Sequence, residues 1–185
     1  QFEPALEAND RVLAALPAGA MSERIGVYRG RLANNPDSWV RIVIFDGIPR
    51  GVVWDGKTMF AIEAPGHSAV ATSEPVMYRL SDLNILPGTM MCGEDSISGN
   101  AAQVYSGMKS EWEVAAAQAA GAVSEITVSV IGDSRFTDAQ GGDAEAVAAI
   151  STRFNNVDGW FSEQVGIQLR VELIETHSRS SDPFT

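Results

Sequence analysis

The stretch EITVSVIGDSRFTDAQGGDAEAVAAISTRFNNVDGWFSEQVGIQLRVELIET, residues 125–176, decides the fold of the C-terminal part of the chain. Apolar and polar residues alternate over 126–131 and 167–174, whereas apolar residues recur at intervals of three and four over 143–165. Alternation predicts β-strands, and a period near 3.6 predicts an amphipathic helix. Strand, helix and strand form a βαβ unit, so we expect the two strands to be adjacent and parallel.

Upstream of this unit the pattern is that of an antiparallel meander. Short β-rich runs fill residues 24–80, and the Asp46-Gly47 and Asp55-Gly56 dipeptides between them supply the positive φ angles of tight hairpin turns. Residues 4–20 are predicted to form one short amphipathic segment with a shared apolar face. That face consists of Leu6, Val12, Leu13 and Leu16.

The sequence predicts an α+β protein in two parts. Residues 1–107 form an antiparallel β-rich domain that ends in a long loop over 82–107, because that stretch lacks periodicity and is rich in Gly, Ser and Asn. Residues 108–123 are a connector whose Ala-rich sequence predicts a helix or a linker between domains. Residues 124–185 supply only two strands and one helix, so this unit either packs on the first part or begins a longer domain.

Composition narrows the function classes. The chain has 185 residues with 13 basic and 24 acidic side chains, a net charge of −11. This charge repels phosphate backbones, so we expect no nucleic-acid partner. No window reaches the roughly 18 to 20 uninterrupted apolar residues of a membrane-spanning helix, so we expect no membrane span.

One cysteine, Cys92, excludes an internal disulfide framework and every thiolate-rich metal cluster. The first residue is Gln, and no basic segment followed by an apolar run precedes it. We therefore expect that a segment has been removed, either a signal peptide or an expression tag. We favour the signal peptide, which makes the protein secreted or periplasmic.

Two stretches together resemble the reprolysin or ADAM-like zinc metallopeptidases, a metzincin family, in zymogen form. Residues 38–65 (SWVRIVIFDGIPRGVVWDGKTMFAIEAP) and 77–83 (MYRLSDL) are similar to the family propeptide. The segment over 125–176 is similar to the first strand, first helix and second strand of the catalytic domain, with Asn155, Asn156 and Val157 at the family's recurrent asparagine and valine. The resemblance implies a propeptide-like domain over 1–107 and an incomplete metallopeptidase-like catalytic domain over 124–185.

Between these stretches, residues 90–95 (MMCGED) resemble a cysteine switch. In such a switch a propeptide thiolate takes the fourth position on the catalytic zinc and displaces the water that would act as nucleophile. The resemblance assigns the thiolate to Cys92, and Gly93 beside it lets the backbone approach the cleft closely. It implies zinc in the full-length protein, with Cys92 as a ligand only in that zymogen.

The family's zinc-binding helix carries HExxHxxGxxH, which this sequence lacks, since its two histidines are His67 and His177. The resemblance therefore implies the N-terminal portion of a zinc metalloendopeptidase precursor that is not catalytic by itself. Its partners would be the remainder of its own catalytic domain and, for the parent enzyme, a peptide or protein substrate. A noncatalytic inhibitor or binding module, complete in residues 1–185, is the alternative.

A third hypothesis starts from Gly132-Asp133-Ser134 after a strand, which is similar to the GDS block of a class of serine esterases. A nucleophilic serine needs a base that is held by an orienting carboxylate. That class has an Asp three residues before its histidine, and here Ile174 precedes His177 by three. We therefore expect Asp133 and Ser134 to end the strand and cap a turn, and His67 and His177 to be solvated loop residues.

We expect the four tryptophans to be core or interface residues. They are Trp39, Trp54, Trp112 and Trp160.

Overall fold

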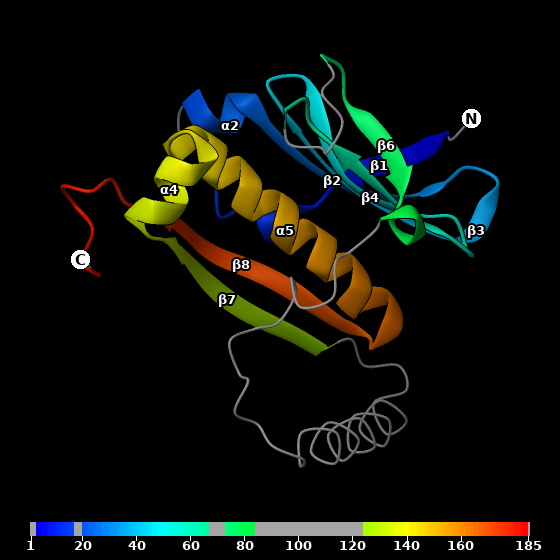
Figure 1. Ribbon diagram of the computed structural model, residues 1–185. Coiled ribbons are helices and arrows are strands. Elements are labelled where there is room, and N and C mark those ends of the chain that lie inside the picture. The colour runs from blue at the N-terminus through cyan, green and yellow to red at the C-terminus, as the bar shows by residue number, and fades with distance from the viewer. Residues whose placement is uncertain (1–2, 17–19, 67–72, 84–123, 185) are drawn as a thin grey trace, which may run out of the picture.

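The computed structural model of the chain describes residues 3–16, 20–66, 73–83 and 124–184. It is an α+β structure with a six-stranded antiparallel sheet, a two-stranded parallel sheet and a few helices (Figure 1). Cys92, most of the predicted loop over 82–107 and the whole predicted connector over 108–123 lie outside the described residues. None of the described helices is long and apolar enough to cross a membrane.

The predicted meander is confirmed. Strands follow one another in the sheet in chain order, each antiparallel to the next. The β3–β4 hairpin turns at Asp46 and Gly47, whose φ angles of 49° and 78° are those of the predicted tight turn. The strands are β1 (Pro4–Ala8), β2 (Ile25–Leu32), β3 (Asn35–Phe45), β4 (Ile48–Trp54), β5 (Met59–Glu63) and β6 (Val76–Arg79), the last followed by a 3-10 turn, η1 (Leu80–Asp82).

The single amphipathic segment predicted over 4–20 is wrong. Its first residues form β1, an edge strand on β2, and Leu6 is 39% exposed there, whereas Val12 is fully buried in the short helix α1 (Asp10–Leu13). Helix α2 (Ala20–Arg24) follows. The spacing of apolar residues is a local signal and does not reveal that residues 4–8 pair with β2. This pairing makes them a strand.

The βαβ unit is confirmed. Strands β7 (Ser124–Gly132) and β8 (Ile167–Thr176) pair in parallel, and helix α5 (Asp143–Gln164) lies between them in the chain. Gly166 adopts a φ of 69°, the left-handed conformation that suits glycine after a helix end. A second helix, α4 (Ser134–Gln140), was not predicted from the sequence.

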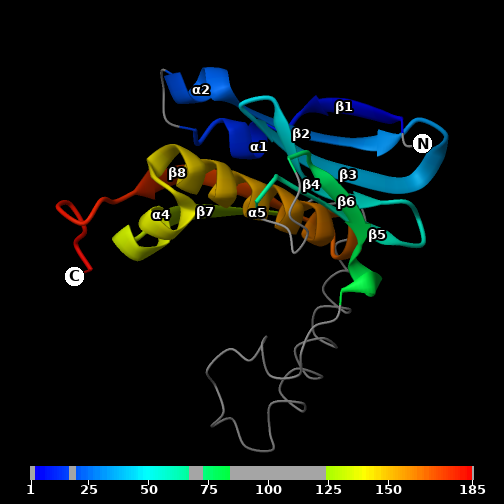
Figure 2. The same ribbon diagram turned by 45° about the horizontal axis from the view of Figure 1, so that its top comes forward.

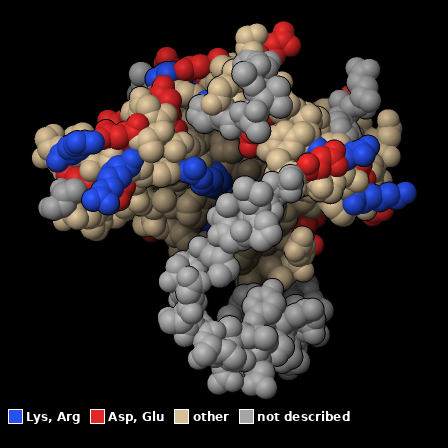
Figure 3. Space-filling model, in the orientation of Figure 1, with Lys and Arg blue, Asp and Glu red and all other residues tan. Residues whose placement is uncertain are grey.

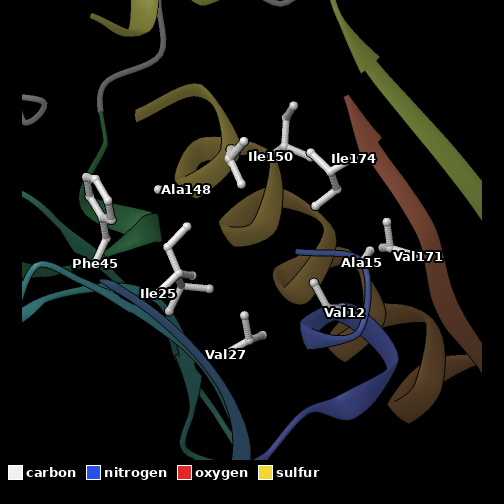
Figure 4. Packing of buried hydrophobic residues seen from close by; sticks show 11 residues of the cluster. Val12, Ala15, Ile25, Val27, Phe45, Ala148, Ile150, Val171 and Ile174 are labelled. Carbon is white, nitrogen blue, oxygen red and sulfur yellow. The ribbon is translucent and has the colours of Figure 1, made fainter. Parts of the chain in front are cut away.

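Helix α5 is the middle layer of the molecule, between the six-stranded sheet and the two-stranded sheet (Figures 1 and 2). One hydrophobic cluster joins all three layers, so the two segments assigned to separate domains share a core (Figure 4). Helix α1, from the N-terminal segment, packs on β8 and so covers part of it, as one of the sequence-based alternatives predicted. The buried members of this cluster are Val12, Ala15, Ile25, Val27, Val43, Phe45, Val147, Ala148, Ile150, Val171 and Ile174.

Candidate functional site

The predicted switch residues, Cys92 and Gly93, lie outside the described residues, as does His67. Among the residues that the structure describes, no group of three or more His, Cys, Asp or Glu side chains could hold a metal ion. The described part of the chain therefore does not fit a resident catalytic zinc. On the face shown in Figure 3, acidic and basic side chains are interspersed.

Asp133 and Ser134 end β7 and begin a helix. The Asp133 carboxylate accepts a hydrogen bond from the Phe136 amide at 2.7 Å and caps α4, which confirms the capping role. Ser134 is 2% exposed, and its amide donates to Asp182 at 2.8 Å. Hydrogen bonds from the Ser134 hydroxyl and from the amides of Phe184 and Ser134 lower the pKa of Asp182. Ser134 thus anchors the C-terminal tail by binding the Asp182 carboxylate. An activated nucleophile would instead contact a base such as histidine.

His177 is not the solvated loop residue that the sequence predicted. Its side chain is 13% exposed, and its Nε2 lies 3.5 Å from Glu175 Oε1. The His177 amide also donates to the Gly132 carbonyl at 3.0 Å. The tail folds back on the end of β7 and α4, where Phe184 packs edge-on against the His177 ring, and this return covers the imidazole.

The most concentrated chemistry in the described residues is a buried polar cluster on the C-terminal half of α5. At its centre is Asp158, whose side chain is 0% exposed. Its Oδ2 lies 3.1 Å from Arg11 Nη2 and 3.2 Å from Arg41 Nε. Its Oδ1 accepts the Leu169 amide of β8 at 3.0 Å. One carboxylate therefore ties together α1, β3, α5 and β8.

Arg41 is buried as deeply as a core residue, with 4% of its side chain exposed. Burial lowers the pKa of its guanidinium, and the charge and hydrogen bond of Asp158 act in the opposite direction. Its other donors are also used, since Nη2 reaches Ser162 Oγ at 2.9 Å and Nη1 reaches the Val40 carbonyl at 3.1 Å. An arginine stays charged in proteins, so this site is a paired ion in the interior.

Asn155 and Asn9 extend the cluster to the sheet. Asn155 is 0% exposed, and its Nδ2 donates to the carbonyls of Tyr28 at 3.0 Å and Ile42 at 3.3 Å. Its Oδ1 accepts from Asn9 Nδ2 at 2.8 Å. The helix thereby contacts the backbone of β2 and β3 directly. We call Asn9, Arg11, Arg41, Asn155 and Asp158 the polar latch.

Gly159 lets the helix approach the sheet beside the polar latch. A Cβ atom at this position would lie 2.6 Å from Trp39 Cζ3 and 2.8 Å from Arg41 Cγ. Trp39 is 4% exposed, which confirms it as a core residue. Trp54 and Trp160 are half-buried, and Trp112 lies outside the described residues.

Sequence reasoning placed Asn155 in a family-like motif and missed the rest of the polar latch. The available signal was Arg41, a single charge inside the otherwise apolar run at residues 39–45. Such a charge indicates a buried partner, because an unpaired buried ion is costly. The partner, Asp158, lies 117 residues away in the chain and was not identifiable from spacing.

A separate hollow of about 500 Å³ lies at the C-terminal end of β7, on the flank of α4 and α5. Its lining is mostly apolar and includes Ile131, Phe136 and Phe154. The Arg153 guanidinium in its wall lies 5.0 Å from the Phe136 ring centroid. Asp133, the carboxylate in the lining, is the α4 cap, so the described residues give this hollow an apolar surface and no paired catalytic groups.

Comparisons with protein-family models, with curated proteins and with solved structures gave no match to this chain.

Proposed function

We propose that the chain is the N-terminal portion of a secreted or periplasmic zinc metalloendopeptidase precursor of the metzincin type. The six-stranded sheet is the pro-segment, and the β7–α5–β8 unit is the start of the catalytic domain. The zinc would be held by residues of the precursor beyond those described, with Cys92 as the latent-state ligand. Residues 1–185 alone are not catalytic.

The observation that carries this proposal is the place of the family-like helix motif in the fold. Asn155 and Asp158 of α5 bind the sheet segments through the polar latch, and Gly159 packs against Trp39. A pro-segment must stay docked on the catalytic domain to keep a switch residue in position. Buried charge pairs between the two segments supply such a fixed orientation.

The test uses the full reading frame that contains residues 1–185. We expect stoichiometric zinc and low peptidase activity in the wild-type precursor. In Cys92→Ala water replaces the thiolate on zinc, so chelator-sensitive hydrolysis of casein should rise at least about tenfold. Met90→Ala is the matched control and should stay latent.

Absence of zinc from the full-length protein, or absence of chelator-sensitive hydrolysis from Cys92→Ala, would overturn the proposal and favour the noncatalytic binding module. Activity that is equally low in both proteins until the sheet is removed by proteolysis would discard the switch and keep the metallopeptidase.

The 185-residue chain gives an independent measurement of the switch. A thiol reagent such as DTNB should react rapidly with Cys92 in the native 185-residue protein and slowly in the zinc-loaded precursor, because a metal-bound thiolate is shielded. Reaction that requires unfolding in both proteins would assign Cys92 to a core instead.

A further inference from the structure

A second hollow lies on the sheet at the C-terminal end of α5, where Trp39, Trp54 and Met59 form a row across three strands. Trp39 is paired with Trp54 on β3 and β4, and Trp54 with Met59 on β4 and β5. Residues directly opposite in an antiparallel sheet share a face, so the three side chains lie together. The last turn of α5 forms the wall of this hollow, whose volume is about 220 Å³. Its lining consists of Asp37, Trp39, Trp54, Met59, Glu163 and Gln164.

The charge of this hollow is negative. Asp37 and Glu163 line it, and among the residues that the structure describes no Lys or Arg does. Among the described residues Asp37 takes part in no ion pair, while Glu163 is partly neutralised by Arg31 at 3.1 Å. Helix α5 has 22 residues and no basic side chain in its last turn, so no residue of the helix itself offsets the negative end of its dipole there.

Aromatic faces beside carboxylates attract cations and exclude anions. One aromatic ring of this row already contacts a cation, because the Arg41 guanidinium lies 5.8 Å from the Trp39 ring centroid. Sites for drug-sized ligands run from roughly 300 to 1,000 Å³, so a hollow of about 220 Å³ takes an end group rather than a large molecule.

We propose that this hollow, which we call the tryptophan pocket, binds an alkylammonium group, from a free quaternary amine or from the side chain of a lysine. The ammonium lies on the Trp54 indole with Asp37 as its counter-ion. The inference stands on the pocket geometry and does not depend on the peptidase proposal.

The test is an NMR titration of the tryptophan indole N–H signals of the 185-residue protein at constant ionic strength. Choline chloride is the probe, and 3,3-dimethyl-1-butanol, which has the same shape without the charge, is its neutral control. Nα-acetyl-lysine methylamide represents the side-chain source. We expect saturable shifts of the Trp54 signal, assigned with Trp54→Phe, from choline or the lysine derivative and none from the alcohol.

Variants locate the binding. Asp37→Asn should weaken binding about fivefold, whereas Glu172→Gln, the same charge change at an exposed position on β8, should leave it unchanged. Arg31→Gln should tighten binding, because it frees the Glu163 carboxylate. Arg179→Gln, which removes an 84% exposed charge elsewhere, should have no such effect.

Asp37 and Glu172 are exposed, so these two variants keep the fold, which circular dichroism checks. Equal shifts from choline and the alcohol would reduce the site to an apolar hollow and overturn the proposal. Equal weakening by Asp37→Asn and Glu172→Gln would also overturn it, since binding would then follow net charge. Absence of a saturable shift with either cation would refute it outright.

Discussion

Along α5, residues 146–150 are buried among aliphatic side chains, whereas Asn155, Asp158 and Gly159 are buried among amides, guanidinium groups and an indole ring. Both halves face the same sheet. The N-terminal half contacts it through aliphatic packing, which has no preferred direction, whereas the C-terminal half contacts it through directional hydrogen bonds. An apolar core tolerates small shifts of packing, while a carboxylate with partners on three other elements fixes one orientation. The comparison indicates that the N-terminal half of α5 supplies stability and the C-terminal half supplies the register of helix on sheet.

The largest expected effect is at the centre of the polar latch. Asp158→Ala leaves the buried Arg41 and the partly buried Arg11 without their counter-ion, so the free energy of unfolding should fall by about 3–5 kcal/mol. Urea unfolding followed by circular dichroism measures this. Asp138→Ala, which removes an exposed partner of Arg179, is the matched control and should cost less than about 1 kcal/mol. Similar losses in the two variants would remove the distinction between the polar latch and an ordinary surface pair.

Gly159→Ala tests the close approach beside the latch. The added methyl group meets the Trp39 ring and Arg41, so we expect a loss of about 1–3 kcal/mol despite the better helix propensity of alanine. Thermal and urea unfolding provide the measurement. The loss should shrink in a Trp39→Leu background, where the ring is gone. A stabilised Gly159→Ala protein would show that helix and sheet are not in contact here.

In the apolar N-terminal half of α5, a conservative substitution should lower the free energy of unfolding by less. Ile150 is 4% exposed in the shared core, and Ile150→Val removes one methylene, so we expect a loss of about 0.5–1.5 kcal/mol. The same unfolding assay measures it, with Ile131→Val at a 48% exposed position as the control. A loss as large as that of Asp158→Ala would reverse the roles assigned to the two halves.

A polar pair at the margin of the sheet gives the last expected effect, a dependence of stability on pH that begins only above about pH 10. Burial and a 2.7 Å hydrogen bond to Glu63 raise the pKa of Tyr78 to about 12. An unfolded tyrosine titrates near 10, so this contribution to stability is complete below about pH 10 and is lost as the pH rises through about 12. Ultraviolet titration should reveal a late-titrating tyrosine signal that disappears in Tyr78→Phe. A native tyrosine spectrum that is unchanged by Tyr78→Phe above pH 11 would contradict the assignment.

The sequence predicted those elements whose signals are local. Alternation and the helical period gave β2 to β5, β7, α5 and β8, and Asp46-Gly47 gave the hairpin turn. The sequence-based prediction was wrong for residues 4–8, because their conformation depends on pairing with β2. It also missed α4, because a helix of seven residues has too few turns to display a period.

The polar latch depends on contacts between residues more than a hundred positions apart, such as Asn9 with Asn155 and Arg41 with Asp158. Charged and amide side chains are usually exposed, so composition alone favours a surface position for each of them. Only the fold brings them together. The predicted switch residue Cys92 lies outside the described residues and stays a prediction.

A double-mutant cycle of Arg41→Ala and Asp158→Ala tests most directly the claim that the sheet is held on α5 by a buried charge pair. Asp158→Ala leaves Arg41 buried without its counter-ion, Arg41→Ala leaves Asp158 paired with Arg11 alone of the two arginines, and the double variant removes both groups. The account predicts that the loss of unfolding free energy in the double variant is smaller than the sum of the single losses by about 1–3 kcal/mol. Additivity within about 0.5 kcal/mol would mean that Arg41 and Asp158 do not act as a pair, and would contradict the account.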